Sequence, residues 1–164
     1  MSMTPNMSQS LQELFLLSGG APIVIDGRSI VQLDRIPLVG PHRINLRFVG
    51  ASVHVDNAVV IAVRKPGKIF LSDGNSVNAV KTWDDPLLPR FISYTVEPCG
   101  NELEVFNKYR IRHNDNFVTE DSFTGNAGMI VSNMGHNIRR YECSNALGPF
   151  APNDLIFDLE WEKM

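Results

Sequence analysis

The chain has 164 residues, of which 43% are hydrophobic and 20% are charged. This length suits one hydrophobic core, so we expect a single soluble domain. With 15 Lys and Arg against 18 Asp and Glu, the formal net charge is −3. This balance argues against a bulk attraction to nucleic acid or to an anionic membrane. No apolar run approaches the roughly 20 residues that a transmembrane helix needs.

The N-terminal residues and the cysteines together predict a cytoplasmic protein. No Lys or Arg precedes Leu11, and the most apolar piece, residues 14–17, is too short for a secretory signal. Two cysteines, Cys99 and Cys143, are too few for a disulfide scaffold and are expected as free thiols. We divide the chain into a segment over 1–20, with a mobile leader and a short helix, and an all-β domain over 21–164.

A short helix is predicted over residues 10–17. Ser10 and Glu13 have the spacing of a capping box, in which each can satisfy a free backbone donor of the first turn. Gly19-Gly20 ends the helix. The apolar residues form one stripe, which we expect to cover one end of a sheet core: Leu11, Leu14 and Phe15.

From residue 21 onward the pattern changes to about ten short strands separated by turns. An Asp26-Gly27 turn indicates a hairpin, and the continuous apolar run 58–63 predicts a strand buried on both faces. Other strands alternate between apolar and polar residues, most clearly 43–49, 103–111 and 154–162. No helix is long enough for a crossover connection. The chain therefore predicts an antiparallel β-sandwich or jelly roll, or a closed β-barrel.

Charged residues are unevenly distributed among these strands. Five Lys and Arg face one Asp in residues 43–68, a local charge of +4, whereas the final strand is acidic. One interpretation is that 43–49, 102–112 and 154–162 are neighbours that pair charges across their outer faces. The alternative is a pocket for a small anion, built from the guanidinium groups of Arg43, Arg47, Arg110 and Arg112.

Residues 82–90 resemble a long loop that Pro86 and Pro89 stiffen. Trp83 in such a loop can stack on a sugar ring, while the carboxylates of Asp84 and Asp85 accept hydrogen bonds from its hydroxyls. The alternative is that Trp83 folds inward and caps the core.

Two further groups of residues could support chemistry. His54 and Asp56 project from the same face of a strand, so inside a barrel they could perform acid–base catalysis, with Arg110 stabilising developing charge. An oxygen-rich segment could bind calcium through the side chains of Asp115, Glu120 and Asp121. The spacing of these residues does not match an EF-hand. A turn without metal is the alternative.

No known catalytic or nucleotide-binding motif occurs in the chain, and we expect no cofactor. We favour a non-catalytic domain that binds a carbohydrate or a small anionic molecule through Trp83, Asp84, Asp85, Arg47 and Arg112. Two alternatives stay open. One is a cofactor-free isomerase, cyclase or lyase that uses His54, Asp56 and Arg110. The other is an interaction or assembly subunit that forms a homo-oligomer. Nucleic acid and membranes are not expected as partners.

Overall fold

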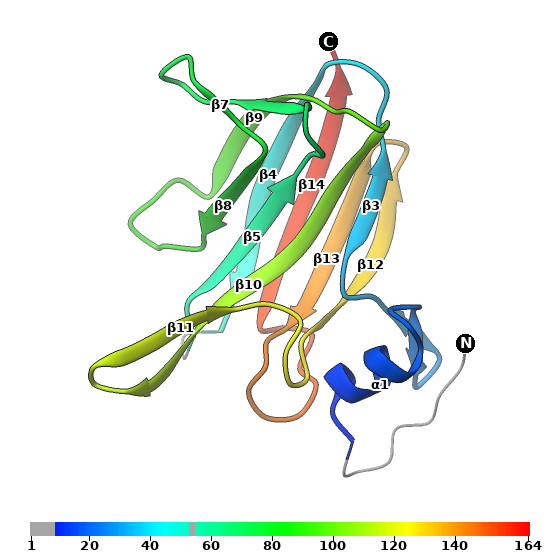
Figure 1. The fold of residues 1–164 in the computed structure, drawn as a ribbon, viewed down its shortest axis with the longest axis vertical. Coiled ribbons are helices and arrows are strands. Elements are labelled where there is room, and N and C mark those ends of the chain that lie inside the picture. The colour runs from blue at the N-terminus through cyan, green and yellow to red at the C-terminus, as the bar shows by residue number, and fades with distance from the viewer. Residues whose placement is uncertain (1–8, 53–54) are drawn as a thin grey trace.

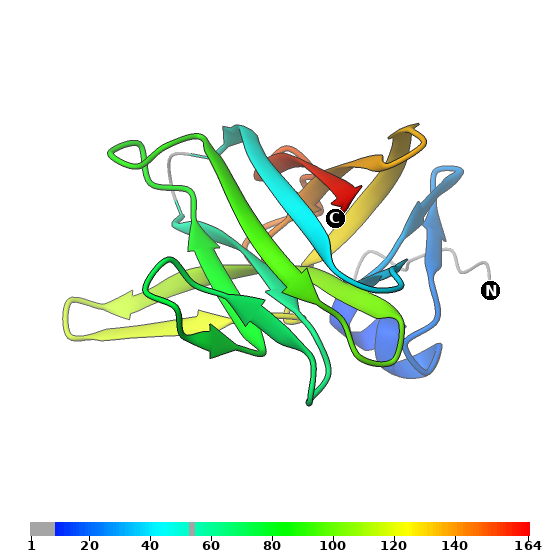
Figure 2. The ribbon, with the colours of Figure 1, turned by 90° about the horizontal axis from the view of Figure 1, so that it is seen from above.

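The computed structural model describes residues 9–52 and 55–164, and strands dominate it. Two antiparallel sheets lie face to face as two layers (Figures 1 and 2). The first, seven-stranded, has the order β12 (Gly128–Gly135), β13 (Ile138–Ser144), β14 (Leu155–Lys163), β4 (His42–Ala51), β9 (Phe91–Glu97), β6 (Lys68–Phe70) and β7 (Ser76–Val77). The second, five-stranded, has the order β11 (Phe117–Asp121), β10 (Glu102–Asn114), β5 (Asn57–Ala62) and β8 (Ala79–Trp83), and β3 (Asp34–Pro37) pairs with the other end of β10.

The core lies between the two sheets because each strand turns alternate residues inward. On β10, Leu103 and Val105 are fully buried, whereas Glu104 between them is partly exposed on the outer face. β5 is buried almost throughout, as predicted for the run 58–63. In the described residues the two large sheets stay separate and do not join into one closed barrel, so the sandwich expectation is confirmed.

The N-terminal helix α1 (Leu11–Leu17) forms as predicted. Ser10 is its N-cap, and the Ser10 hydroxyl accepts a hydrogen bond from the Glu13 backbone N–H at 3.3 Å. The helix lies against the hairpin of β1 (Ile23–Ile25) and β2 (Arg28–Ile30) at one end of the sandwich (Figure 1). A second small core joins them, formed by Leu11, Leu14, Phe15, Ile23, Ile30 and Ile130.

Some of the predictions concern residues outside the described ranges, and others are not tested by the fold. The mobile leader concerns residues that are almost all outside the described ranges, and the division of the chain at residue 20 stays a prediction. The turn between β10 and β11 is short, because β10 continues to Asn114 and pairs with β11 from Phe117. Cys99 and Cys143 are free thiols.

The expected charge pairing holds for two of the three strands. β14 and β4 are neighbours, and Arg43 lies 3.9 Å from Glu162 across them. The prediction that 102–112 joins them is wrong, because β10 belongs to the other sheet. There Glu102 pairs with Arg35 at 3.6 Å and with Arg64 at 3.8 Å. Alternation identifies the two faces of a strand but does not say which sheet the strand enters.

Candidate functional site

The outward face of the five-stranded sheet carries a cluster of side chains around Arg110. In one row across the sheet, Trp83 of β8 lies opposite Ala58 of β5, which lies opposite Lys108 of β10. The guanidinium of Arg110 crosses β5 and lies over the indole of Trp83, with Cζ 3.9 Å from the ring centroid. Two strand spacings of about 4.8 Å separate β10 from β8. A long side chain can bridge that distance because Ala58 between them is small.

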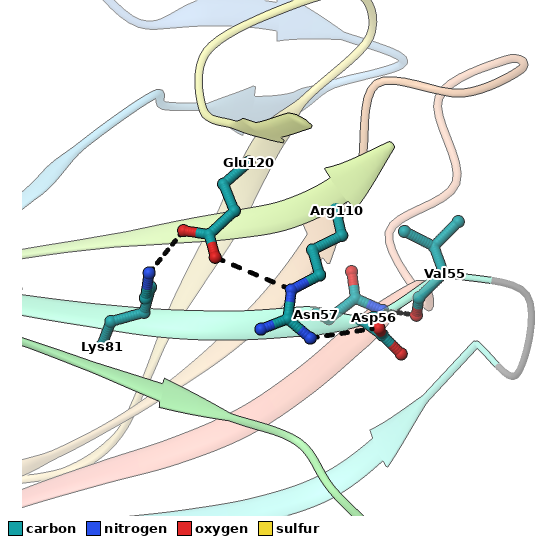
Figure 3. Close-up of polar contacts among 6 residues, drawn as sticks. All are labelled: Val55, Asp56, Asn57, Lys81, Arg110 and Glu120. Carbon is teal, nitrogen blue, oxygen red and sulfur yellow. Dashed lines mark hydrogen bonds and ion pairs between the residues drawn. The ribbon is translucent and has the colours of Figure 1, made fainter. Parts of the chain in front are cut away.

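Two carboxylates hold the guanidinium of Arg110 from different sides (Figure 3). Its Nη1 lies 3.4 Å from Oδ2 of Asp56, just before β5, and its Nε lies 3.7 Å from Oε1 of Glu120, on β11. Glu120 also accepts a hydrogen bond from Nζ of Lys81, on β8. Arg110 is therefore fixed by residues from β8, from β11 and from the start of β5. A positioned guanidinium loses little entropy when it binds a ligand.

The pKa of Glu120 is lowered chiefly by the hydrogen bond from Lys81; burial opposes this shift, and the positive charges of Lys81, Arg110 and Lys108 add to it. This carboxyl group therefore stays ionised and keeps its two cationic partners through the neutral range. It is suited to accept hydrogen bonds rather than to donate a proton.

A pocket of about 410 Å³ adjoins the cluster, and Asp56 belongs to both. Its walls come from the segment before β5 and from the loop between β8 and β9: Ala51, Ser52, Val55, Asp56, Asp84, Pro86 and Arg90. The side chain of Asp84 is only 3% exposed and contacts Nη1 of Arg90. The Asp84 N–H donates to the carbonyl of Asn57 at 2.8 Å, which fixes this wall to β5. The pocket is thus lined by the exposed carboxylate of Asp56 and by the ion pair of Asp84 with Arg90.

Residues of two separate sequence hypotheses meet here. Trp83 and Asp84 were expected to bind a ligand, and Asp56 and Arg110 to act in an enzyme. Trp83 is the last residue of β8 rather than part of the following loop, and it lies half-buried on the outer face. Asp85 accepts a hydrogen bond from the Leu87 N–H and shapes the loop.

The two remaining arginines of the ligand-binding prediction lie apart. Arg112 is exposed on β10, two residues beyond Arg110. Arg47 lies on β4 of the other sheet, with its guanidinium 5.4 Å from the ring of Phe91. The expectation that one pocket gathers these arginines is therefore wrong, because β4 and β10 belong to opposite layers of the sandwich.

The expected interior catalytic site needs a correction. His54 lies outside the described residues. Arg110 does meet Asp56, but on the outer face of the sheet rather than inside a barrel. The reason is that Arg110 alternates with Tyr109, whose ring is fully buried and whose hydroxyl contacts Thr124 at 2.6 Å.

The residues expected to bind calcium have other contacts. Glu120 faces Lys81 and Arg110, and Asp121 accepts a hydrogen bond from the Thr119 hydroxyl at 2.9 Å. Asp115 lies in the exposed turn between β10 and β11. Across residues 9–52 and 55–164, no group of three or more His, Cys, Asp or Glu side chains is arranged to hold a metal.

Sequence reasoning missed a second polar cluster, between the sheets. Asp34 of β3 accepts hydrogen bonds through one oxygen, from Nη1 of Arg139 at 2.8 Å and from the hydroxyl of Tyr141 at 2.7 Å. Tyr141 is fully buried and stacks on Phe157 at 4.6 Å. Burial raises the pKa of Tyr141, and the negative charge of Asp34 raises it further. No signal in the sequence paired these residues, because β3 itself was not predicted.

Comparisons with known proteins add no relative: no protein family, curated protein or solved structure matches the chain. Among the described residues, no helix has both the length and the apolar character needed to cross a bilayer.

Proposed function

We propose that this protein is a non-catalytic β-domain that binds a carbohydrate at the Trp83–Arg110 cluster and in the adjoining pocket. The observation that carries the proposal is the convergence of an indole, a fixed guanidinium and two carboxylates beside a pocket of about 410 Å³. Sugars present apolar ring faces together with hydroxyls that both donate and accept hydrogen bonds. The cluster offers a partner for each of these groups.

The size and the charges of the site support binding. The pocket volume falls in the range of small-molecule sites, roughly 300–1,000 Å³. Asp56 has a side chain that is 70% exposed, so an incoming hydroxyl can reach its oxygens. Catalysis by a general acid would need a carboxyl pKa moved toward neutrality, whereas the pKa of Glu120 is moved away from it.

Isothermal titration calorimetry against a panel of oligosaccharides, with intrinsic fluorescence as a second readout, tests this proposal. We expect Trp83→Ala to weaken binding about tenfold, the effect of losing roughly 1.4 kcal/mol of ring packing against the sugar together with the surface that positions Arg110. The matched control is Phe91→Ala, which removes an exposed ring beside an arginine on the other sheet. Phe91→Ala should leave the affinity unchanged.

Two results would reject the proposed function. One is the absence of binding to every oligosaccharide in the panel by the folded protein. The other is an affinity that Trp83→Ala and Phe91→Ala change equally. Melting temperatures of both variants should be measured first, so that unfolding is not mistaken for lost binding.

A second function, self-association through α1, is favoured by one feature. Leu16 and Leu17 are 76% and 65% exposed on the helix, and Leu16 lines a pocket of about 310 Å³ together with Phe15 and Phe123. A protruding side chain and a hollow on one patch can fit the same patch of a second copy about a two-fold axis. Light scattering should then detect a dimer that Leu17→Asp dissociates and that Leu87→Asp, at another exposed leucine, leaves intact. A monomeric wild-type protein at high concentration would exclude it.

A further inference from the structure

The outward face of the five-stranded sheet divides into two halves of different charge. At one end, Glu102 and Glu104 are compensated by Arg35 and Arg64. At the other end four cations face only two carboxylates, Asp56 and Glu120, a local charge of +2 in a chain whose net charge is −3. These cations are Lys81, Lys108, Arg110 and Arg112.

The four cations fall into two pairs by their contacts. Lys81 and Arg110 are already held by Glu120, and Arg110 also by Asp56. In the described residues, neither Lys108 nor Arg112 forms an ion pair within 4.0 Å, although both project from the same face of β10 as Arg110. The first pair builds the site, and the second pair is left to meet charge from outside.

We infer that the ligand of the proposed site is an acidic oligosaccharide, whose sugar ring packs against Trp83 and whose carboxylates contact Lys108 and Arg112. This inference rests on the proposed carbohydrate-binding function and names its ligand class. Lys108 and Arg112 lie four residues apart, which the strand rise converts to about 13 Å along β10. A linear ligand with repeated acidic groups can contact both, because the guanidinium fork and the ammonium each match a carboxylate.

The sheet surface beside Lys108 is low on the side toward β5, and Arg110 beside Asp56 forms the next row toward Arg112. β5 contributes only small or short outward side chains in this region, Ala58 and Val60, and both are buried beneath their larger neighbours. Phe106 on β10 lies opposite Val60, and its ring is tilted against that of Phe123 with the centroids 4.9 Å apart. The short side chains of β5 therefore leave Lys108 on β10 accessible from the side of Trp83 on β8.

The two carboxylates in the cluster favour an acidic sugar over a nucleic acid. A single-stranded nucleic acid carries a phosphate at every nucleotide and is bound by grooves that are uniformly basic. Asp56 and Glu120 would repel those phosphates, whereas they can accept hydrogen bonds from sugar hydroxyls. The mixture of exposed acids and bases therefore matches a chain that carries hydroxyls on every unit as well as negative charges.

The test compares a galacturonate tetrasaccharide with its fully methyl-esterified form, which has the same backbone without the charge. Calorimetry on the full chain at low salt should show about tenfold tighter binding of the acid, and the difference should shrink as salt is added. In the double variant Lys108→Gln, Arg112→Gln the preference for the acid should fall to about twofold, while the affinity for the ester stays the same. Arg64→Gln, at an exposed arginine on the far half of the sheet, is the matched control and should keep the preference.

The outcomes separate this inference from the proposed function. Equal binding of acid and ester, or a preference that survives the double variant, would overturn the acidic ligand and leave carbohydrate binding in place. Tighter binding of a single-stranded oligonucleotide than of the acid would also overturn it. If neither sugar nor any other oligosaccharide binds, the proposed function fails together with it.

Discussion

Two clusters in this protein are built from the same parts, an arginine, a tryptophan and a carboxylate. In the first, Arg139 donates to Asp34 at 2.8 Å between the sheets and lies 5.5 Å from the ring of Trp161. In the second, on the outer face, Arg110 lies 3.4 Å from Asp56 and 3.9 Å from the ring of Trp83. The side chains of Arg139 and Asp34 are 21% and 16% exposed, against 41% and 70% for Arg110 and Asp56.

The difference shows that burial gives the same set of side chains two different roles, one structural and one suited to binding. Between the sheets, Asp34 satisfies both Arg139 and the buried hydroxyl of Tyr141, and a missing partner would leave a desolvated polar group. On the outer face water screens the longer contact, so a ligand can replace a partner at little cost. The inner cluster stabilises the sandwich, and the outer one is open to exchange.

The strongest way to break this comparison is to remove one carboxylate charge from each cluster. We expect Asp34→Asn to lower the free energy of unfolding by about 2–3 kcal/mol, because Arg139 loses its counter-charge and the Tyr141 hydroxyl its ionised acceptor. Asp56→Asn should change it by less than about 1 kcal/mol, as is usual for exposed pairs. Urea denaturation at pH 7 measures both. Equal effects of the two substitutions would contradict the division of roles.

Alkaline pH should weaken the interior and leave the outer cluster less affected. Burial raises the pKa of Tyr141, Tyr109 and Cys143 in the folded protein. Folding is then fully supported below the ordinary values of 9.0 for Cys and 10.0 for Tyr, and the support is lost as pH rises beyond them, since only the unfolded chain releases these protons.

Each such group should cost about 1.4 kcal/mol for every pH unit above its ordinary pKa. Denaturation midpoints at pH 7, 9, 10 and 11 measure how steeply the free energy of unfolding falls with pH. Tyr109→Phe removes one titrating group, so the fall above pH 10 should be less steep in this variant. Stability that stays constant up to pH 11 would show that these groups ionise in the folded state.

Much of the fold could be predicted from the sequence, because the burial of one face of a helix or strand makes apolar residues recur at a regular spacing. The Ser10 cap and the apolar stripe of α1, the buried run of β5 and the alternation of β10 all form as expected. The edge strands β3, β7, β8 and β11 were missed, since short strands at an edge bury little and have no clear alternation.

The site was predictable in its members and not in its arrangement. Trp83, Asp56 and Arg110 were each singled out, but in separate hypotheses. What joins them is strand order: β8, β5 and β10 lie side by side although 18 residues separate β8 from β10 in the chain. Strand order depends on which sheet each strand enters, and hydrophobic period does not encode that choice. Arg47 also lies on a strand of alternating apolar and polar residues, as Arg110 does, but its strand β4 belongs to the other sheet.

A smaller effect should distinguish Arg110, which covers the ring of Trp83, from Arg139, which lies near the ring of Trp161. Arg110→Gln should uncover one face of Trp83 and increase the quenching of its fluorescence by acrylamide, while the free energy of unfolding falls by about 1 kcal/mol or less. Arg139→Gln should instead cost stability without a comparable change at Trp83. The measurement uses a Trp161→Phe background, so that one indole reports. Unchanged quenching in Arg110→Gln would mean that the guanidinium does not shield the ring.

The smallest expected effect is the response of the outer cluster to acid, and it isolates Glu120. Its pKa is lowered in the folded protein, so the contribution of its ion pairs is present above the unfolded value of 4.5 and is lost as pH falls through the folded value. Protonation releases Lys81 and one of the two carboxylate anchors of Arg110. The guanidinium then has more freedom above Trp83, and acrylamide quenching of that indole should rise below pH 4.5. Glu120→Gln removes the titrating group, so its quenching should be raised already at pH 7 and should vary less with acid. A transition of the same size in Glu120→Gln would assign the response to another carboxyl group, with Asp56 as the nearest candidate, and would leave Asp56 as the principal anchor of Arg110.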